Sequence, residues 1–261
     1  FLGPTLAAEL RRLTGAAPAA WAETVALTAD LVAVATDADI AGPGAVAVDA
    51  QGAAAALVLS GTDDGPTLGL VELTGATEPV DLTRPSAVPD RSAPIVAVPG
   101  RVLDADGLTR WTALGLALTC ADLVGTMTGA VGLSVGYAAE RRQYGVPVGS
   151  FQAVQHLLAD AHVATEGSRS VALHAAWAVD ALPPDEALAA AAVAKAYCAR
   201  AARSVWAAAI QVHGGIGTTR ECLAHVYLRR ALLAADVLGG VGPSLDRVLA
   251  NNVLGGGRGL R

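Results

Sequence analysis

Residues 138–161 read AAERRQYGVPVGSFQAVQHLLADA and join two helical patterns at a sharp corner. The first helix is predicted to end on the charged cluster that contains Arg141. A Gly-Val-Pro-Val-Gly turn then breaks the helical period. Ser150 is predicted to cap the second helix, in which apolar residues recur at helical spacing from Phe151 to Ala161. The corner therefore predicts two long helices packed side by side, with a pair of arginines placed where they join.

Helical periodicity continues from Asp106 almost to the end of the chain. Pro183 and Pro184 stop one helix, and the acidic residues that follow suit the N-terminal dipole of the next. Long alanine-rich helices with short connections predict a C-terminal antiparallel four-helix bundle over residues 103–255, followed by a flexible tail at 256–261. The predicted helices span residues 108–140, 150–182, 185–213, 219–237 and 243–252.

The N-terminal part is predicted to combine a reduced helical segment, residues 1–41, with a small β-sheet or barrel domain, residues 42–102. Leucine and valine recur at helical spacing from Leu6 to about Asp37. After Gly42, short apolar or alternating runs stand between Gly, Pro and Asp residues, as the strands of a small sheet do. The predicted fold class is therefore mainly α with a small β domain. The predicted strand runs are residues 45–50, 54–61, 67–73 and 93–100.

Composition excludes several classes of function. The 261 residues carry a net charge of −6 and a single lysine, so they offer no basic surface for a nucleic-acid backbone. Three widely spaced cysteines and five scattered histidines predict neither a disulfide framework nor a metal site. Free thiols are expected in a reducing compartment, so the chain is interpreted as cytoplasmic. It begins at Phe1 without a signal-peptide pattern, and its start is interpreted as trimmed or incompletely observed.

The apolar run from Trp111 to Ala139 contains Asp122 as its one charged residue and is long enough to span a membrane. Glycine, threonine and serine interrupt the run, and no aromatic belts flank it. A helix buried on most of its circumference in a soluble bundle explains these features better. No membrane span is predicted.

Two motifs lie in the predicted bundle in a fixed order. The first is RRQYG at residues 141–145 with FQ at 151–152, and the second is QVHGGIGTTRE at residues 211–221. Together they resemble the acyl-CoA dehydrogenase family of flavoproteins, which carries Arg-x-Gln-Phe-Gly, Phe-Gln, and Gln-x-x-Gly-Gly-x-Gly followed by Thr-x-Glu. The phrase VDLTRPSA at residues 80–87 is similar to the family's exit from its β domain. The resemblance covers residues 42–249.

The resemblance implies that both motifs contact FAD. In the family, these groups reach across a subunit interface to the ADP half of an FAD that the neighbouring protomer holds. The chemistry agrees, because an arginine fork suits a pyrophosphate, glutamine both donates and accepts hydrogen bonds, and glycine lets a backbone approach closely. The expected cofactor-binding residues are Arg141, Gln143, Tyr144, Val148, Phe151, Gln211, Gly214 and Gly215.

A purely structural alternative stays open for the same residues. Arg141 and Gln143 could cap the C-terminus of a helix, and Gly214 with Gly215 could form an ordinary helix C-cap. His213 is predicted to be a hydrogen-bonded packing residue rather than a ligand.

The resemblance also exposes a missing group. The family desaturates an acyl-CoA thioester with a glutamate that removes the α-proton, and that glutamate occupies one of two known positions. Here those positions hold Leu238 and Gly115, neither of which can accept a proton. Asp236 or Asp122 remains open as a substitute base. In the family, two segments of the β domain form a wall against the flavin ring. Neither segment occurs between Ala41 and Gly100, so an incomplete flavin pocket is expected.

These features predict a non-catalytic or half-site subunit of a heteromeric, α2β2, FAD-dependent acyl-CoA dehydrogenase. A larger catalytic subunit is the expected partner, sharing FAD with this chain and binding most of the acyl-CoA. The resemblance to actinobacterial steroid-degrading enzymes implies a bulky substrate and a role in cholesterol catabolism. Two alternatives stay open: a self-sufficient homomeric dehydrogenase with an aspartate base, and a non-enzymatic helical scaffold.

Overall fold

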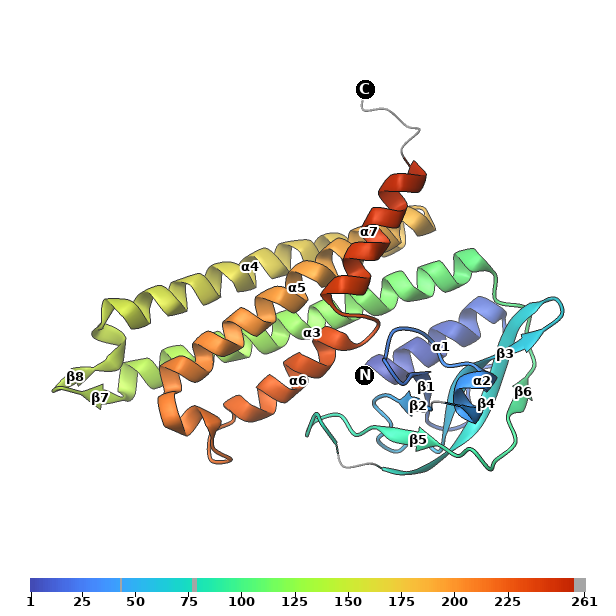
Figure 1. Ribbon diagram of the computed structural model, residues 1–261, viewed down its shortest axis with the longest axis horizontal. Helices are drawn as coiled ribbons and strands as arrows, with labels where there is room; N and C mark the ends of the chain where they lie inside the picture. Colours follow the sequence, from blue (N-terminus) through green and yellow to red (C-terminus); the bar gives the residue numbers. More distant parts are fainter. Residues whose placement is uncertain (43, 77–78, 256–261) are drawn as a thin grey trace.

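The computed structural model describes residues 1–42, 44–76 and 79–255, so the predicted tail at 256–261 lies outside the described residues. A bundle of long helices lies beside a smaller β part (Figure 1). Helix α1 (Leu2–Thr14) lies between the sheet and the bundle. It is tied to the bundle by Trp111, a fully buried side chain whose indole Nε1 donates to the carbonyl oxygen of Leu6 at 2.9 Å.

The bundle confirms the predicted helices, with their ends shifted by a few residues. Its members are α3 (Ala105–Glu140), α4 (Gln152–Ala181), α5 (Pro184–His213), α6 (Ala224–Asp236) and α7 (Val241–Gly255). Helix α5 lies at the centre and packs on α3, α4, α6 and α7. Its inward side is lined with alanine, and small side chains let the neighbouring backbones approach closely. Helix α3 contains an 18-residue window that is apolar enough to cross a membrane, and 56% of that window is buried inside the fold.

The predicted cap at Ser150 is wrong. Ser150 lies in a short 3₁₀ turn, η1 (Val148–Ser150), and its hydroxyl donates to the carbonyl oxygen of Pro147 at 2.7 Å. Helix α4 begins two residues later, with Phe151 at its N-cap and no side-chain cap bond. The hydroxyl is engaged by a local carbonyl in the turn, so it is not available to cap the helix.

The six-stranded sheet corrects the prediction for residues 1–41. Residues predicted as helix form β1 (Glu23–Thr28), and only the short α2 (Asp37–Ala41) follows it. The apolar spacing of Val25 and Leu27 suits a strand as well as a helix. Tertiary contacts select the strand, because β1 pairs with strands on both sides and is buried along almost its whole length. The remaining strands are β2 (Ala45–Ala47), β3 (Ala55–Thr62), β4 (Gly65–Ala76), β5 (Ala87–Pro89) and β6 (Val96–Val98).

The strand order β3-β1-β2-β5-β4-β6, with an additional β3–β4 pairing, closes the sheet on itself. Strands β3 and β4 pair antiparallel from Ala55 opposite Glu72 to Thr62 opposite Gly65. Only β1 and β3 run parallel among the described strand pairs. Four of the six strands were predicted from sequence, whereas β1 and the short β5 were not.

The lysine of the chain, Lys195, is fully buried on α5. Its ammonium donates to the carbonyl oxygens of Ala234 at 2.5 Å and Val237 at 2.8 Å, which end α6, and to the Thr119 hydroxyl at 3.1 Å. Burial lowers the pKa of Lys195 from 10.5 to about 8, against the smaller raising effect of nearby groups. The lysine thus satisfies the last carbonyls of one helix from the core of another.

Stability should depend on pH through Lys195. The pKa of Lys195 in the folded state lies below its value in the unfolded state. The buried charge therefore lowers the free energy of unfolding below about pH 8, and this destabilisation disappears as the pH rises toward 10.5. The free energy of unfolding is expected to rise by up to about 3 kcal/mol over that window, relative to Lys195→Met. Urea unfolding of both proteins between about pH 7 and pH 10 measures this difference. If the difference in the free energy of unfolding between the two proteins does not change with pH, the lowered pKa of Lys195 is contradicted.

Candidate functional site

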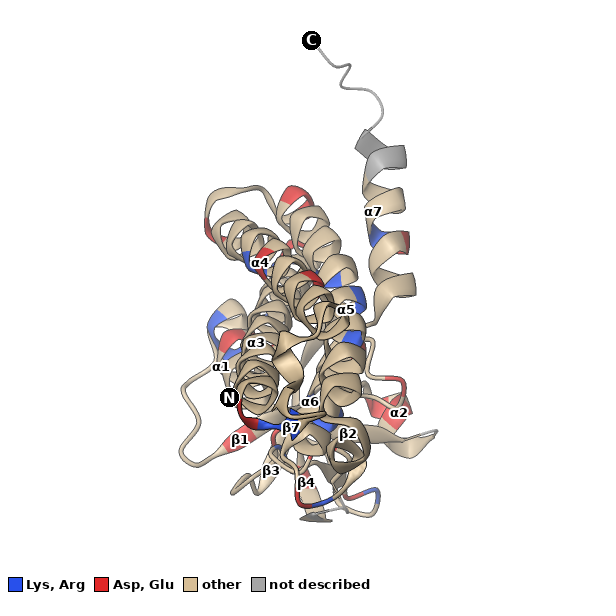
Figure 2. Ribbon diagram, turned by 90° about the vertical axis from the view of Figure 1, so that its left-hand side faces the viewer, with Lys and Arg blue, Asp and Glu red and all other residues tan. Residues whose placement is uncertain are grey.

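The corner between α3 and α4 is a small hairpin that projects from one end of the bundle (Figure 1). Strands β7 (Arg142–Gln143) and β8 (Val146–Pro147) pair antiparallel across a two-residue turn. Both turn residues have positive φ, 52° at Tyr144 and 82° at Gly145, as tight hairpin turns that match the strand twist require. The turn leaves the Tyr144 side chain 94% exposed. In Figure 2, which looks at this end of the molecule, basic residues colour the ribbon at β7.

The guanidinium of Arg141 is exposed and forms no hydrogen bond or ion pair within the described part of the chain. Its backbone is used on both sides: the N–H donates to the carbonyl oxygen of Tyr137 at 2.9 Å to close α3, and the carbonyl oxygen accepts from the N–H of Val148 at 2.7 Å. Its neighbours are engaged locally, since Arg142 donates to the carbonyl oxygen of Gly145 at 3.3 Å and Gln143 to that of Arg142 at 2.8 Å. The side chain of Arg141 therefore does not cap the helix and remains available to a ligand.

An aromatic pair stands beside this arginine. The rings of Tyr144 and Phe151 meet edge to face, with centroids 6.4 Å apart and planes at 85°. Phe151 is 38% exposed, and Val148 is half-buried between the hairpin and α4. The hairpin thus offers an exposed apolar surface next to a free cation, which suits a ligand with both a ring and an anionic group.

The second motif closes α5 at the same end of the bundle (Figure 1). Gly214 has φ 63° and caps α5, with its N–H directed to the carbonyl oxygens of Gln211 and Ile210, so the helix-cap interpretation is correct for this residue. The 3₁₀ turn η2 (Gly214–Thr218) follows. A Cβ placed on Gly214 or on Gly215 would meet no atom within 4 Å, which leaves open space against this backbone. Gln211 is exposed one turn earlier.

A ring stack joins the two motifs. Tyr137 of α3 and His213 of α5 lie with centroids 4.6 Å apart and planes at 28°. Tyr137 lies one turn before Arg141, and His213 directly precedes Gly214, so the stack fixes the two motifs relative to each other. His213 is 5% exposed and its Nδ1 lies 2.8 Å from the carbonyl oxygen of Ala209, which confirms the predicted packing role. Tyr137 was missed from sequence, although its place one turn before the motif was the available signal.

The two positions expected to hold the base lie against each other. Leu238 is fully buried, and a Cβ added at Gly115 would lie 2.2 Å from its Cδ1. The Leu238 backbone has φ 60°, and its N–H donates to the carbonyl oxygen of Leu31 at 2.7 Å. An apolar side chain therefore fills the space where either carboxylate would project.

Both candidate substitute carboxylates form ion pairs elsewhere. The Asp236 side chain is 57% exposed and pairs with Arg203 at 3.4 Å. Asp122 pairs with Arg230 at 2.5 Å and with Arg84 at 3.0 Å. The described residues also contain no group of histidine, cysteine and acidic side chains that could hold a metal.

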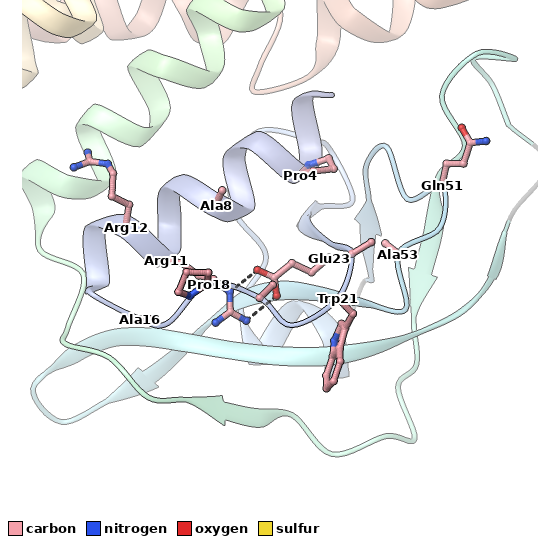
Figure 3. A pocket seen from close by; sticks show the side chains of 12 residues that line it. Pro4, Ala8, Arg11, Arg12, Ala16, Pro18, Trp21, Glu23, Gln51 and Ala53 are labelled. Atoms are coloured by element: carbon pink, nitrogen blue, oxygen red, sulfur yellow. Dashed lines mark hydrogen bonds and ion pairs between the residues drawn. The ribbon is translucent and has the colours of Figure 1, made fainter.

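Two hollows lie near the sheet. One, of about 230 Å³, lies between the sheet and the end of α6 and is lined mostly by aliphatic side chains, with three charged ones: Asp49, Asp81 and Arg84. Asp49 is engaged by the N-terminal amine, at 3.0 Å, and by the Leu2 N–H, at 2.6 Å. The other, of about 470 Å³, lies between α1 and β1 (Figure 3). Its charged groups are already paired, since Glu23 accepts two hydrogen bonds from Arg11, at 2.5 and 2.7 Å, and thereby raises the pKa of that guanidinium. Neither hollow presents a free carboxylate.

Comparison with known proteins connects this geometry to one family. The family described as acyl-CoA dehydrogenase, C-terminal domain, matches residues 113–251. The acyl-CoA dehydrogenase FadE34 of Mycobacterium tuberculosis is 38% identical over 156 residues, which cover 60% of this chain and 22% of that protein. The chain thus spans less than a quarter of the length of this relative.

Two solved structures are similar over almost the whole chain. The Tcur3481-Tcur3483 steroid ACAD shares 27% identity and a TM-score of 0.78, covering 98% of this chain and 77% of that one. The ChsE4-ChsE5 complex from Mycobacterium tuberculosis shares 25% identity and a TM-score of 0.78, covering 97% and 75%.

The contact between Gly115 and Leu238 is testable by a double-mutant cycle. Gly115→Ala is expected to destabilise the fold by about 1–3 kcal/mol through overpacking, and Leu238→Ala by about 2–5 kcal/mol through the cavity it leaves. The double variant should cost less than the sum of the two, because the alanine methyl occupies part of that cavity. Chemical unfolding measures all three values.

Gly132→Ala is the matched control on the same helix, since a Cβ there meets no atom within 4 Å. It should raise stability by roughly 0.5–1 kcal/mol through helix propensity alone. Strict additivity of Gly115→Ala and Leu238→Ala would show that the two positions do not touch.

Proposed function

The chain belongs to the acyl-CoA dehydrogenase family, and on that premise we propose that it is a subunit, without a base of its own, of a heteromeric FAD-dependent acyl-CoA dehydrogenase. It completes the FAD site of a larger catalytic subunit in an α2β2 assembly. One observation carries the proposal: Leu238 packs on Gly115 where a base would project, while the Arg141 guanidinium stands free at the bundle end.

Desaturation of an acyl-CoA needs a carboxylate within hydrogen-bond reach of the α-carbon proton. The side chain that fills this place here is a fully buried leucine. A buried methyl group can neither accept the proton nor leave room for a water that would. The chain therefore contributes binding and positioning rather than the proton-transfer step.

The residues that would hold the cofactor fit an ADP group. FAD, when bound, supplies the acceptor for the hydride that leaves the β-carbon. Arg141 offers a charged, planar pair of donors for a pyrophosphate, and no described residue of this chain forms an ion pair with it. Gly214 and Gly215 leave open space where the backbone can meet the ligand directly. Gln143, Gln211, Tyr144, Val148 and Phe151 supply the polar and apolar contacts around them.

The similar structures support the proposed partner and substrate class. Both are named as two-component assemblies, ChsE4-ChsE5 and Tcur3481-Tcur3483, and the latter is named as a steroid ACAD. A bulky acyl-CoA such as a steroid side-chain thioester is the substrate class we propose, with a place in cholesterol catabolism. The three free cysteines fit a reducing, cytoplasmic compartment.

Arg141→Ala should lower the FAD content of the assembly purified with its partner subunit by about tenfold or more at limiting FAD, because a desolvated charge-assisted pair is lost. Absorbance at the flavin band, normalised to protein, measures the loss. Arg169→Ala removes an exposed arginine from the middle of α4 and should leave the FAD content unchanged. Equal FAD content in the Arg141→Ala and wild-type assemblies would reject the cofactor contact.

The homomeric alternative makes an opposite prediction. If Asp236 served as the base, the isolated chain would oxidise an acyl-CoA and Asp236→Asn would abolish the reaction. We expect no turnover by the isolated chain with an artificial electron acceptor, and an unchanged rate for the assembly that carries Asp236→Asn, because this carboxylate is exposed and paired with Arg203. The scaffold alternative is excluded by a flavin spectrum of the assembly that changes when Arg141 or Gln211 is substituted.

A further inference from the structure

Two thiols and one ammonium group lie together inside the bundle, and the proposed function uses none of them. Cys120 of α3 and Cys198 of α5 are both fully buried, and both are free thiols. Lys195 lies one helical turn before Cys198, and its ammonium donates to the hydroxyl of Thr119, the residue that precedes Cys120. The contact between α3 and α5 therefore brings all three groups to one place. We call Cys120, Cys198 and Lys195 the thiol–lysine cluster.

The two thiols contact each other directly. The S–H of Cys120 donates to the sulfur of Cys198, and this hydrogen bond, together with burial, raises the pKa of Cys120. The same hydrogen bond lowers the pKa of Cys198, and the charge of Lys195 lowers it further, while burial opposes both effects. Because the thiolate is the nucleophile, Cys198 is the more reactive thiol of the pair. Cys120 stands in contact with it as a second thiol that still carries its proton.

A polar hollow reaches the edge of the cluster. It has a volume of about 300 Å³ and lies between α1, α3 and α6, where Thr119, Asp122 and Arg230 contribute to its lining. Thr119 connects the hollow to the cluster, because it lines the hollow and its hydroxyl accepts from Lys195 at 3.1 Å. One threonine thus stands between the hollow and the buried ammonium. A polar molecule little larger than water has a short route to the thiols when the helices open locally.

We propose that Cys120 and Cys198, with Lys195 beside them, are a redox-active pair that a peroxide converts into a disulfide joining α3 to α5. In a reducing compartment both thiols stay free, as they are in the structure. The inference goes beyond the proposed function and does not rest on it, since it concerns the interior of the bundle and not its FAD-binding end.

The reaction takes two steps when hydrogen peroxide is the oxidant. The thiolate of Cys198 attacks one oxygen of the peroxide, the O–O bond breaks, and the leaving hydroxide takes a proton to become water. Cys198 is then a sulfenic acid, oxidised by two electrons. The sulfur of Cys120 loses its proton and attacks the sulfur of Cys198, so that an S–S bond forms and the hydroxyl group leaves with that proton as a second water.

Each member of the cluster has a separate part in this reaction. The positive charge of Lys195 favours the thiolate of Cys198 over the thiol. Cys120 lies in contact with the sulfenic acid as soon as it forms, so it reacts before a second peroxide oxidises Cys198 further. The disulfide closes a loop that contains the hairpin and all of α4. Closing a loop of this length restricts the unfolded chain and thereby stabilises the bundle.

Thiol mapping of the purified full chain tests the pair. The reduced protein is treated with hydrogen peroxide, denatured in acid, labelled with N-ethylmaleimide and digested for mass spectrometry. The peptides that contain Cys120 and Cys198 should lose their label and appear as one linked species, 2 Da lighter than the two reduced peptides combined, which dithiothreitol reverses. Cys222 is the internal comparison, since it is more exposed than either. Oxidation of Cys222 while Cys120 and Cys198 keep their label overturns the proposal.

Three variants assign the parts of the cluster. Cys222→Ser is the matched control and should form the disulfide at the wild-type rate. Cys120→Ser should stop at the sulfenic acid of Cys198, which dimedone traps. Lys195→Met should slow disulfide formation by about three- to tenfold, because the charge that favours the thiolate is lost. A rate unchanged by Lys195→Met, or a Cys120→Ser protein that dimedone does not label at Cys198, contradicts the assigned parts.

Urea unfolding of the Cys222→Ser protein tests the effect of the disulfide on the fold. The oxidised form should unfold at a urea midpoint about 1 M higher than the reduced form, and dithiothreitol should remove the shift. An oxidised form that is no more stable than the reduced form shows that the disulfide does not fit the α3–α5 contact. The FAD content of the assembly should be the same with Cys222→Ser or Cys120→Ser, whereas Arg141→Ala lowers it, so a failure here is distinct from a failure of the proposed function.

Discussion

The hydrogen bonds from Lys195 to the last carbonyls of α6 determine how the interior of this protein is arranged. They end the helix at Asp236 from the side of α5, and the chain then turns through Leu238 with positive φ. That turn carries the Leu238 side chain inward onto Gly115. A buried ammonium is costly unless its hydrogen bonds are satisfied, and here carbonyl dipoles at a helix C-terminus and one hydroxyl satisfy it. The cost appears as the lowered pKa of the lysine.

The interior and the outer end of the bundle differ in chemistry because different forces build them. The Leu238 side chain is fully buried and packs against Gly115. The hairpin end is built by backbone geometry instead, by positive φ at the turn and by the α5 cap, with the Tyr137–His213 stack between them. The side chain at position 238 can therefore change without disturbing the hairpin end. The proposed function depends on this independence, because it combines an interior without a base with intact cofactor contacts.

Sequence predicted the parts whose signal is local. The long helices were correct because their periodicity extends over many turns, and the RRQYG corner was recognisable because its residues are consecutive. The segment at Glu23–Thr28 was misread because its apolar spacing fits both a helix and a strand, and only pairing on both sides makes it β1. The ring stack and the Gly115–Leu238 contact join residues far apart in the chain. Alignment with the family motifs suggested that positions 115 and 238 lack a base, but the sequence did not show that these two residues are in contact.

Helix α5 connects all of these features, because each side of it meets a different neighbour. Its inner side carries Lys195, which positions the end of α6, and its C-terminal cap carries the glycine pair. Its remaining side faces solvent. The central helix thus holds the packed interior and the proposed cofactor end along one rigid axis.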